Sequence, residues 1–421
     1  MIVVILLAVL ALVLPLAILR SFSFLQKVLV LLVILSHLTI MLFLHYRLVS
    51  ATNYPIVVDV HTDTQKYYDD TASFEAHRPF DVTVGDAKAA SKGSIHFGYH
   101  YVLGMLWTIT SRPMLAMRLL KTLLYFTSLS CLARVWCREY GLRLAMWGVM
   151  FLGIVFTPII YYNYRNLKDS LLLSLFMFTM ALLDTIVRPA ENQLRPRKRH
   201  KTVLAWCLVL VLLYAILTFR AYVAAMILIA VIMHAIVNSR MNLKARVSLS
   251  AALAIIVLIA FRTGAVASFM ELGDARMSAG GVLAALSVHG MIQAFLSPLP
   301  WGEIRIMEPL SVPFYALYWI LLPYALYAML RHLWSNLNWY LFMYIMTLYV
   351  VGAAIGDPPR KRLIVYPILV TWVLAHLAHK RWGRAEQAEH EIESADTMDP
   401  EYEQEYIQAP EGGSPAFGMN D

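Results

Sequence analysis

The sequence predicts an all-α polytopic membrane protein with about eleven transmembrane helices, plus interfacial helices in its outer loops. Of the 421 residues, 60% are hydrophobic and 15% are charged, which is more apolar than a soluble domain of this size. Apolar runs near 20 residues, long enough to cross a bilayer, recur along the chain. The runs are continuous rather than alternating, so helices are favoured over a barrel.

The apolar runs define the predicted spans in chain order. They lie at 1–19, 28–46, 114–135, 144–162, 168–187, 202–218, 221–238, 247–262, 311–330, 337–355 and 363–379. The first run lacks both a basic leading segment and a small-residue cleavage site. We therefore interpret it as a retained span rather than a signal peptide.

The segment 96–111, "HFGYHYVLGMLWTITS", decides the orientation of everything that follows it. If it spans the membrane, the basic loop "RPRKRHK" at 195–201 falls on the same side as loop 47–95. If it lies in the interface, that basic loop is cytoplasmic, as the positive-inside rule favours. We take the second interpretation, which gives an outside N-terminus and a cytoplasmic C-terminus. Further basic residues then share the cytoplasmic side: Arg134, Arg138, Arg143, Arg240, Lys244, Arg246, Lys380, Arg381 and Arg384.

A transmembrane domain at 1–380 then carries two large outer loops. The first, 47–111, contains the early acidic residues and the interfacial helix. The second, 263–309, contains the apolar piece "GVLAALSVHGMIQAFL" at 281–296, and if this piece spans, the last three spans reverse. The remainder, 381–421, is acidic and polar, and we expect a disordered cytoplasmic tail.

Charge and cysteine content exclude two classes of function. The net charge of +8 arises largely from loops between apolar runs, so it does not indicate nucleic-acid binding. Cys131, Cys137 and Cys207 all lie in or beside predicted spans. They support neither a disulfide framework nor a zinc site.

The stretch "YYNYRNLKDS" at 161–170 places charges at the outer mouth of a span. Arg165, Lys168 and Asp169 are spaced i, i+3 and i+4, so on a helix they share one face. An ionisable group inside a span costs about 2.5 kcal/mol or more unless it faces a cavity or a partner. Either the side chains reach the headgroups, or they form a site.

Further cations stand at outer ends of spans, against the positive-inside expectation. Arg220 lies in the tight turn "LTFRAYVAA", and Arg360 and Arg362 lie in "GDPPRKRL" before the last span. A bound phosphate explains this excess, because Arg binds phosphate as a fork and Lys as a point charge. The alternative is a set of anchors that bind lipid headgroups.

The first outer loop supplies carboxylates in "VVDVHTDTQKYYDDTASFEAH". Asp59 and Asp63 follow a span closely, so they lie near the membrane, and Asp70 follows one turn after Tyr67. A carboxylate there can act as a general base toward a hydroxyl. The spacing matches no calcium or zinc motif, so a divalent cation is compatible with the loop but is not indicated. A solvated acidic loop is the other interpretation.

Several short motifs give the chain a resemblance to the C-type glycosyltransferase superfamily, in particular to its protein mannosyltransferases and aminoarabinose transferases. The motifs are "DTQKYYDDTA", "GYHYVLGMLWTI", "MRLLKTLLYFTSLSCLARVWCREYG", "YYNYRNLKDSLLL", "FRAY" and "RKRLIVYP", within 28–380. The chain departs from the pattern in three ways. Neither the interfacial helix nor "FRAY" has the usual proline, and loop 263–309 lacks the second acidic pair of metal-using members.

The resemblance implies inverting transfer of a sugar from a polyprenyl-phosphate carrier to a glycan, lipid or protein acceptor. It also implies an active site on the outer face of a bacterial plasma membrane, surrounded by membrane lipid, with no nucleic-acid partner and no metal required by a motif. Asp63 would be the catalytic base. The donor phosphate would be bound by Arg165, Lys168, Arg220, Arg360 and Arg362. Supporting or sugar-binding residues would be Asp59, Tyr67, Tyr68, Asp70, Asp169 and Tyr222.

Two other functions fit the same layout. A surface-polysaccharide polymerase or ligase would use a lipid-diphosphate donor and depend mainly on outer-loop arginines. A flippase for lipid-linked sugar would show internal repeats and charges at mid-membrane, whereas the charges here cluster at helix ends.

Overall fold

The structure is a computed structural model that describes residues 2–52, 62–93, 97–155, 168–187, 199–237, 312–331 and 364–396, together with Lys244 and Ser248. Within these residues almost every position is helical and no β-strand occurs. The chain divides into two compact units, Met1–Ala375 and His376–Asp421. The all-α class predicted from the sequence is confirmed for the described part of the chain.

The helices follow the apolar runs closely. Apart from 247–262, of which only Ser248 is described, and 337–355, which lies outside the described residues, the described part of each run falls on a helix. The long elements are α1 (Ile2–Ile18), α2 (Phe24–Thr52), α6 (Pro113–Tyr140), α7 (Leu142–Met150) with the π-helix η2 (Phe151–Val155), α9 (Asp169–Val187), α10 (Arg199–Phe219), α11 (Ala221–Val237), α16 (Val312–Arg331) and α19 (Val365–Asp396).

Four described helices are long and apolar enough to cross a membrane. They contain the stretches Phe24–Phe43, Pro113–Tyr140, Asp169–Ile186 and Thr202–Phe219. Shorter apolar helices lie at Ile2–Ile18, Leu142–Ile154, Val223–Ile236 and Ile320–Arg331. A membrane protein follows from these stretches, whereas the count of about eleven spans stays a prediction.

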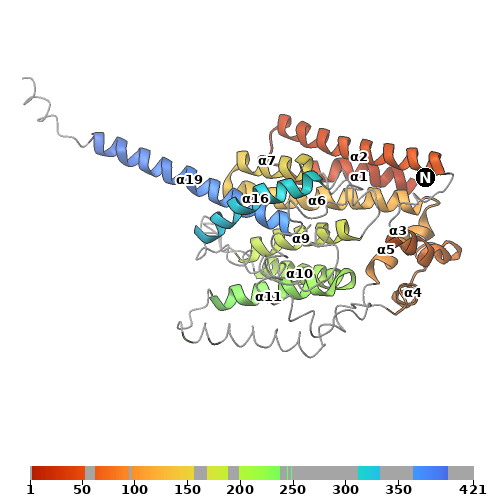
Figure 1. The fold of residues 1–421 in the computed structure, drawn as a ribbon. Coiled ribbons are helices and arrows are strands. Elements are labelled where there is room, and N and C mark those ends of the chain that lie inside the picture. The colour runs from red at the N-terminus through yellow and green to blue at the C-terminus, as the bar shows by residue number, and fades with distance from the viewer. Residues whose placement is uncertain are drawn as a thin grey trace, which may run out of the picture. The chain divides into compact units, whose positions relative to one another are not determined.

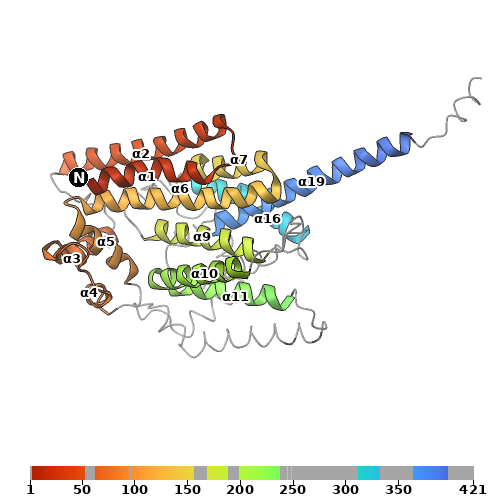
Figure 2. The same cartoon turned by 180° about the vertical axis from the view of Figure 1, so that it is seen from behind.

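Helix α6 is the centre of the first unit, because it packs against α1, α9, α7, α5 and α2. Its side chains are buried on all sides, as expected for a helix that has no polar stripe. Figures 1 and 2 show α1, α6, α9 and α10 side by side. The two ends of α6 therefore mark the two ends of this group of helices.

The π-helix η2 is held by two neighbouring helices. The Tyr125 hydroxyl of α6 donates to the Leu152 carbonyl at 2.7 Å, and His37 Nε2 of α2 lies 2.5 Å from the Gly153 carbonyl. Carbonyls that lose regular helical partners must find others when they are buried. Both side chains thus fix the point at which the chain leaves α7.

Four short elements from the segment that the sequence predicts to be the first outer loop gather at one end of α6. They are α3 (Thr62–Thr71), the 3₁₀ helix η1 (Ala72–Ala76), α4 (Val84–Ala90) and α5 (Gly98–Ile109). The first turn of α4 is fixed by a capping box, in which Thr83 and Asp86 bind each other's backbone N–H. Figure 1 shows this group beyond the end at which α6 begins.

Both termini of α5 lie where α10 ends and α6 begins. Its first residue, Gly98, lies against Thr218 and Phe219 at the end of α10. Its last residue is followed after three positions by Pro113, where α6 begins. The 12 residues of α5 extend about 18 Å, well short of a hydrocarbon core of about 30 Å. The interfacial placement of this segment stays a prediction.

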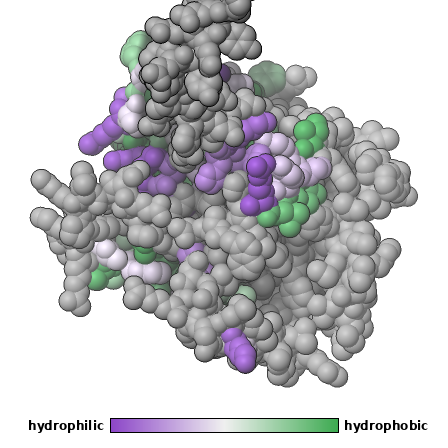
Figure 3. Space-filling model, turned by 90° about the vertical axis from the view of Figure 1, so that its left-hand side faces the viewer, coloured by the Kyte–Doolittle hydropathy of each residue, from purple (hydrophilic) through white to green (hydrophobic). Residues whose placement is uncertain are grey.

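The opposite end of α6 turns into α7 at Gly141. Its φ of +85° is one that side chains rarely adopt, so a glycine is required there. Nearby, Trp136 Nε1 donates to Thr371 Oγ1 of α19 at 3.1 Å, and Arg138 lies 3.9 Å from the buried Asp184 carboxylate of α9. Hydrophilic and hydrophobic side chains adjoin one another on this end of the molecule (Figure 3).

Helix α19 corrects one prediction about the tail. The acidic, polar composition predicts a disordered tail at 381–421, whereas α19 continues to Asp396. The stretch "KRWGRAEQAEHEIESAD" is rich in Ala, Glu, Gln and Arg, which are strong helix formers whatever their polarity. Low hydrophobicity was therefore a poor guide to disorder in 381–396, and residues 397–421 lie outside the described part.

Candidate functional site

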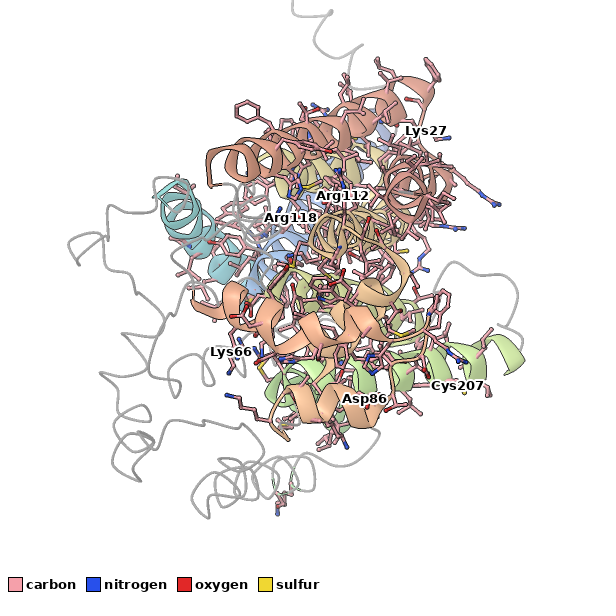
Figure 4. All side chains as sticks on the ribbon, turned by 90° about the vertical axis from the view of Figure 1, so that its right-hand side faces the viewer. Lys27, Lys66, Asp86, Arg112, Arg118 and Cys207 are labelled. Carbon is pink, nitrogen blue, oxygen red and sulfur yellow. The ribbon has the colours of Figure 1, made fainter. Side chains whose placement is uncertain are left out.

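Buried and part-buried polar side chains from six segments meet at the end of α6 that contacts the group of short helices α3 to α5. We call this group the polar cluster. Its members are His45 of α2, Tyr67 and Asp70 of α3, Tyr99 and His100 of α5, Arg118 and Lys121 of α6, Lys168 and Asp169 at the start of α9, and Arg220 between α10 and α11. The view in Figure 4 is along the long helices from this end, with Arg118 and Arg112 close together.

Helix α3 presents Tyr67, Asp70 and Thr71 to α5, because residues three and four apart share a helix face. The Tyr67 ring centroid lies 4.6 Å from that of Tyr99 and 5.3 Å from that of His100. Trp107 Nε1 donates to the Thr71 hydroxyl at 3.1 Å, and this hydroxyl donates to the Tyr67 carbonyl at 2.7 Å. These contacts fix α3 on α5.

His100 forms a pair with Asp70 across the two helices. His100 Nε2 lies 3.4 Å from Asp70 Oδ2, and the histidine side chain is almost fully buried. Burial lowers the pKa of His100 below its usual value of 6.5, while the Asp70 carboxylate opposes that shift. Burial also raises the pKa of the neighbouring Tyr99 well above its usual value. At neutral pH both rings are therefore uncharged.

The start of α9 brings a cation and an anion into the cluster. Leu172 N–H donates to the Lys168 carbonyl at 3.1 Å, so Lys168 occupies the N-cap position and Asp169 follows in the first turn. A carboxylate in the first turn interacts favourably with the helix dipole. Lys168 Nζ lies 5.9 Å from the centre of the Tyr67 ring, a cation–π distance.

Arg220 joins the cluster from the junction of α10 and α11. Its N–H donates to the Ile216 carbonyl and its carbonyl accepts from Val223, so the residue ends one helix and begins the next. Arg220 Nη2 lies 3.3 Å from Asp169 Oδ1, and the aspartate side chain is only 4% exposed. Asp169, which the resemblance gives as a supporting residue, therefore contacts Arg220.

Two cations in α6 were missed by the analysis of the sequence. Arg118 pairs with His45 Nδ1, and Lys121, one turn later, is completely buried. Lys121 interacts electrostatically with Arg118 and with Asp169. The sequence does contain a pattern that could have identified them, namely two cations spaced i, i+3 in the apolar run "MRLLKTLL". Ionisable residues inside such a run are costly and usually functional.

The remaining predicted site residues divide into three groups. Tyr68 lies beside the cluster, with its ring 5.1 Å from that of Trp107. Asp63 lies in α3, one turn before Tyr67, and Tyr222 lies in α11, but their side chains are outside the described part. Four residues lie wholly outside the described residues: Asp59, Arg165, Arg360 and Arg362.

Cations outnumber carboxylates among the described members of the polar cluster. Its described members include four cations, Arg118, Lys121, Lys168 and Arg220, and the two carboxylates of Asp70 and Asp169. No group of three or more His, Cys, Asp or Glu in the described part of the chain could hold a metal ion. Buried Arg and Lys side chains in such numbers suit a phosphate or another anion.

Comparisons of the chain with protein-family models, with curated proteins and with solved structures found no match. The function must therefore be inferred from the chemistry of the polar cluster and from its position at the end of the apolar helices.

Proposed function

We propose that the protein transfers a sugar from a polyprenyl-phosphate carrier to an acceptor, with inversion at the anomeric carbon. The observation that carries the proposal is the burial of Lys168, Arg118 and Lys121 with Arg220 at one end of membrane-length helices. A phosphate anchored by its own lipid tail would reach that position directly. The short helices of the first loop cover the same end and bring tyrosines and a carboxylate to it.

The chemistry of such a reaction needs the groups that the cluster contains. The bond between the anomeric carbon and the phosphate oxygen breaks, and its electron pair stays on the polyprenyl phosphate. Preorganised cations stabilise that charge, and they do so best where water is excluded. Lys168, Arg220, Arg118 and Lys121 would share this role. Tyr67 and Tyr99 would line the sugar, because flat rings stack on the apolar faces of sugars.

The finer membrane arrangement belongs to the same proposal. We place about eleven spans in a bacterial plasma membrane, with the polar cluster on the outer face. The residues Arg165, Arg360 and Arg362 would add to the phosphate site from that face. Asp63, or a group that acts in its place, would take the proton of the acceptor hydroxyl.

The test uses membranes from host cells that lack the gene, because these would retain unused donor and unmodified acceptor. Purified protein is added in detergent, and release of free polyprenyl phosphate is followed by mass spectrometry. We expect release with the wild type and a loss of about 10²–10³-fold for Lys168→Ala or Arg220→Ala, by analogy with removal of one oxyanion donor. Arg20→Gln is the matched control, since Arg20 is an exposed cation at the opposite end of α6.

Three outcomes would refute the proposal in different ways. If the wild type releases no polyprenyl phosphate, it is not a transferase of this type. If it moves lipid-linked sugar across vesicles without consuming it, it is a flippase. If it releases polyprenyl diphosphate instead, it is a polymerase or ligase.

A further inference from the structure

The two ring nitrogens of His100 differ, because Nε2 has a hydrogen-bond partner among the described residues and Nδ1 has none. Nε2 faces Asp70 Oδ2 at 3.4 Å. A carboxylate can only accept a hydrogen bond, so Nε2 carries the proton and Nδ1 of the neutral ring is an acceptor. Nδ1 is buried and has no hydrogen-bond partner among the described residues. A buried acceptor without a partner is unfavourable, and a ligand hydroxyl that donates to it would remove that penalty.

The surroundings of His100 favour the neutral ring that this role requires. From α3 it is faced by Asp70, Lys66 and Tyr67, and from the start of α9 by Lys168. Burial and the two lysines lower the pKa of His100, and the Asp70 carboxylate raises it. The ring is therefore unprotonated at neutral pH and can form a stabilised imidazolium when it accepts a proton.

We propose that His100, oriented by Asp70, takes the proton from the acceptor hydroxyl in the reaction proposed above. The oxygen lone pair forms the new bond to the anomeric carbon as the O–H proton moves to Nδ1. The bond to the phosphate breaks, and the released charge lies among the cations of the polar cluster. Water then removes the proton from the imidazolium. His100 is the catalytic base in this scheme, Asp70 is a positioning residue, and the role assigned to Asp63 passes to His100.

The arrangement follows a general logic of acid–base sites. A carboxylate that binds one ring nitrogen fixes the tautomer and stabilises the charged ring that forms. Tyr67 packs edge-on against His100 at 5.3 Å and also lies under Lys168. A hydroxyl held at Nδ1 would therefore lie close to the group that binds the leaving phosphate.

The test measures polyprenyl phosphate release in gene-deleted membranes between pH 5 and 8. We expect the wild-type rate to fall on the acid side, as His100 becomes protonated. His100→Asn should reduce the rate by about 10²–10⁴-fold and remove the acid limb. Asp70→Asn should slow the reaction and move the acid limb to lower pH, because the carboxylate raises the pKa of His100. Free imidazole should partly restore His100→Ala.

His77→Asn is the matched control. His77 also lies in the first outer loop and also has a buried Nδ1 without a partner among the described residues, but it packs against Phe74 rather than the polar cluster. Its rate and pH profile should match those of the wild type.

The inference is overturned if His100→Asn keeps the wild-type rate or its acid limb, or if Asp63→Asn alone removes that limb. Failure of imidazole to restore folded His100→Ala also counts against it. A wild type that releases no polyprenyl phosphate overturns the proposed function and this inference together. Release with an unchanged His100→Asn profile overturns this inference alone.

Discussion

Replacement of Gly104 by alanine should loosen the outer-loop helices over the polar cluster. Gly104 lies in the middle of α5, where a Cβ would come within 2.5 Å of Phe74 Cδ2 and 2.9 Å of Phe74 Cε2. Phe74 is itself buried in η1, so its ring cannot simply turn into solvent. The methyl group would have to displace the ring or push α5 away from η1.

The size of the effect follows from two opposing contributions. Overpacking of a filled site costs about 1–3 kcal/mol, whereas Gly→Ala inside a helix gains up to about 1 kcal/mol. Gly85→Ala in α4 isolates the second contribution, because its Cβ would meet only the Thr83 hydroxyl at 3.4 Å, an ordinary contact. The two variants should therefore differ in local stability by about 1–3 kcal/mol.

Hydrogen exchange measured by mass spectrometry reports the free energy of local opening in peptides that cover 98–109. Amides of α5 should exchange faster in Gly104→Ala than in Gly85→Ala, by about tenfold for each 1.4 kcal/mol. The double variant with Phe74→Leu should recover part of the loss, since it removes atoms that the new methyl meets. Equal protection in Gly104→Ala and Gly85→Ala would refute the reasoning.

Three further predictions concern the Asp169–Arg220 ion pair, the protonation of His100, and the hydrogen bond from Trp136 to Thr371 of α19. Asp169→Asn should lower the free energy of unfolding by about 1–3 kcal/mol, and a double variant with Arg220→Gln should lose less than the sum of the single losses in a detergent titration. Because burial lowers the pKa of His100 below 6.5, the unfolded chain binds the proton first. The folded state should then lose stability as pH falls below 6.5, and thermal unfolding of His100→Asn should depend less on pH in that range. Thr371→Val should cost about 1–3 kcal/mol, since it leaves the buried Trp136 N–H without its acceptor, and an unchanged unfolding midpoint would contradict this.

The positions of the helices could be predicted from the sequence because the length of an apolar run depends only on neighbouring residues in the chain. The described parts of the apolar runs are helical, although α2, α6 and above all α19 continue beyond the predicted limits, and the short segment around His100 is a 12-residue helix. The run 144–162 shows where a local pattern is insufficient. Its helix changes to a π-helix at Phe151, held by His37 and Tyr125 from other helices. Such contacts depend on packing that no run of hydrophobic residues reveals.

Prediction of the candidate site was partial for the same reason. Lys168, Asp169 and Arg220 stand at helix ends, where a charge beside an apolar run is conspicuous, and the structure brings them together. Arg118 and Lys121 lie inside an apolar run and were passed over as part of it. The pairing of two residues from different helices, such as His100 with Asp70, requires knowledge of which helices are neighbours.

The buried cations indicate that the short helices α3 to α5 support the polar cluster rather than merely cover it. Arg118 and Lys121 lie one and two turns into α6, at a depth where lipid would make them costly. They are surrounded instead by protein: Arg118 pairs with His45, and Lys121 interacts with Asp169. Asp169 is in turn held by Arg220, which ends α10 against the first turn of α5. Displacing α5 should therefore weaken the support of Arg220, of Asp169 and, through Asp169, of Lys121, so function should be lost when α5 moves even if the long helices stay intact.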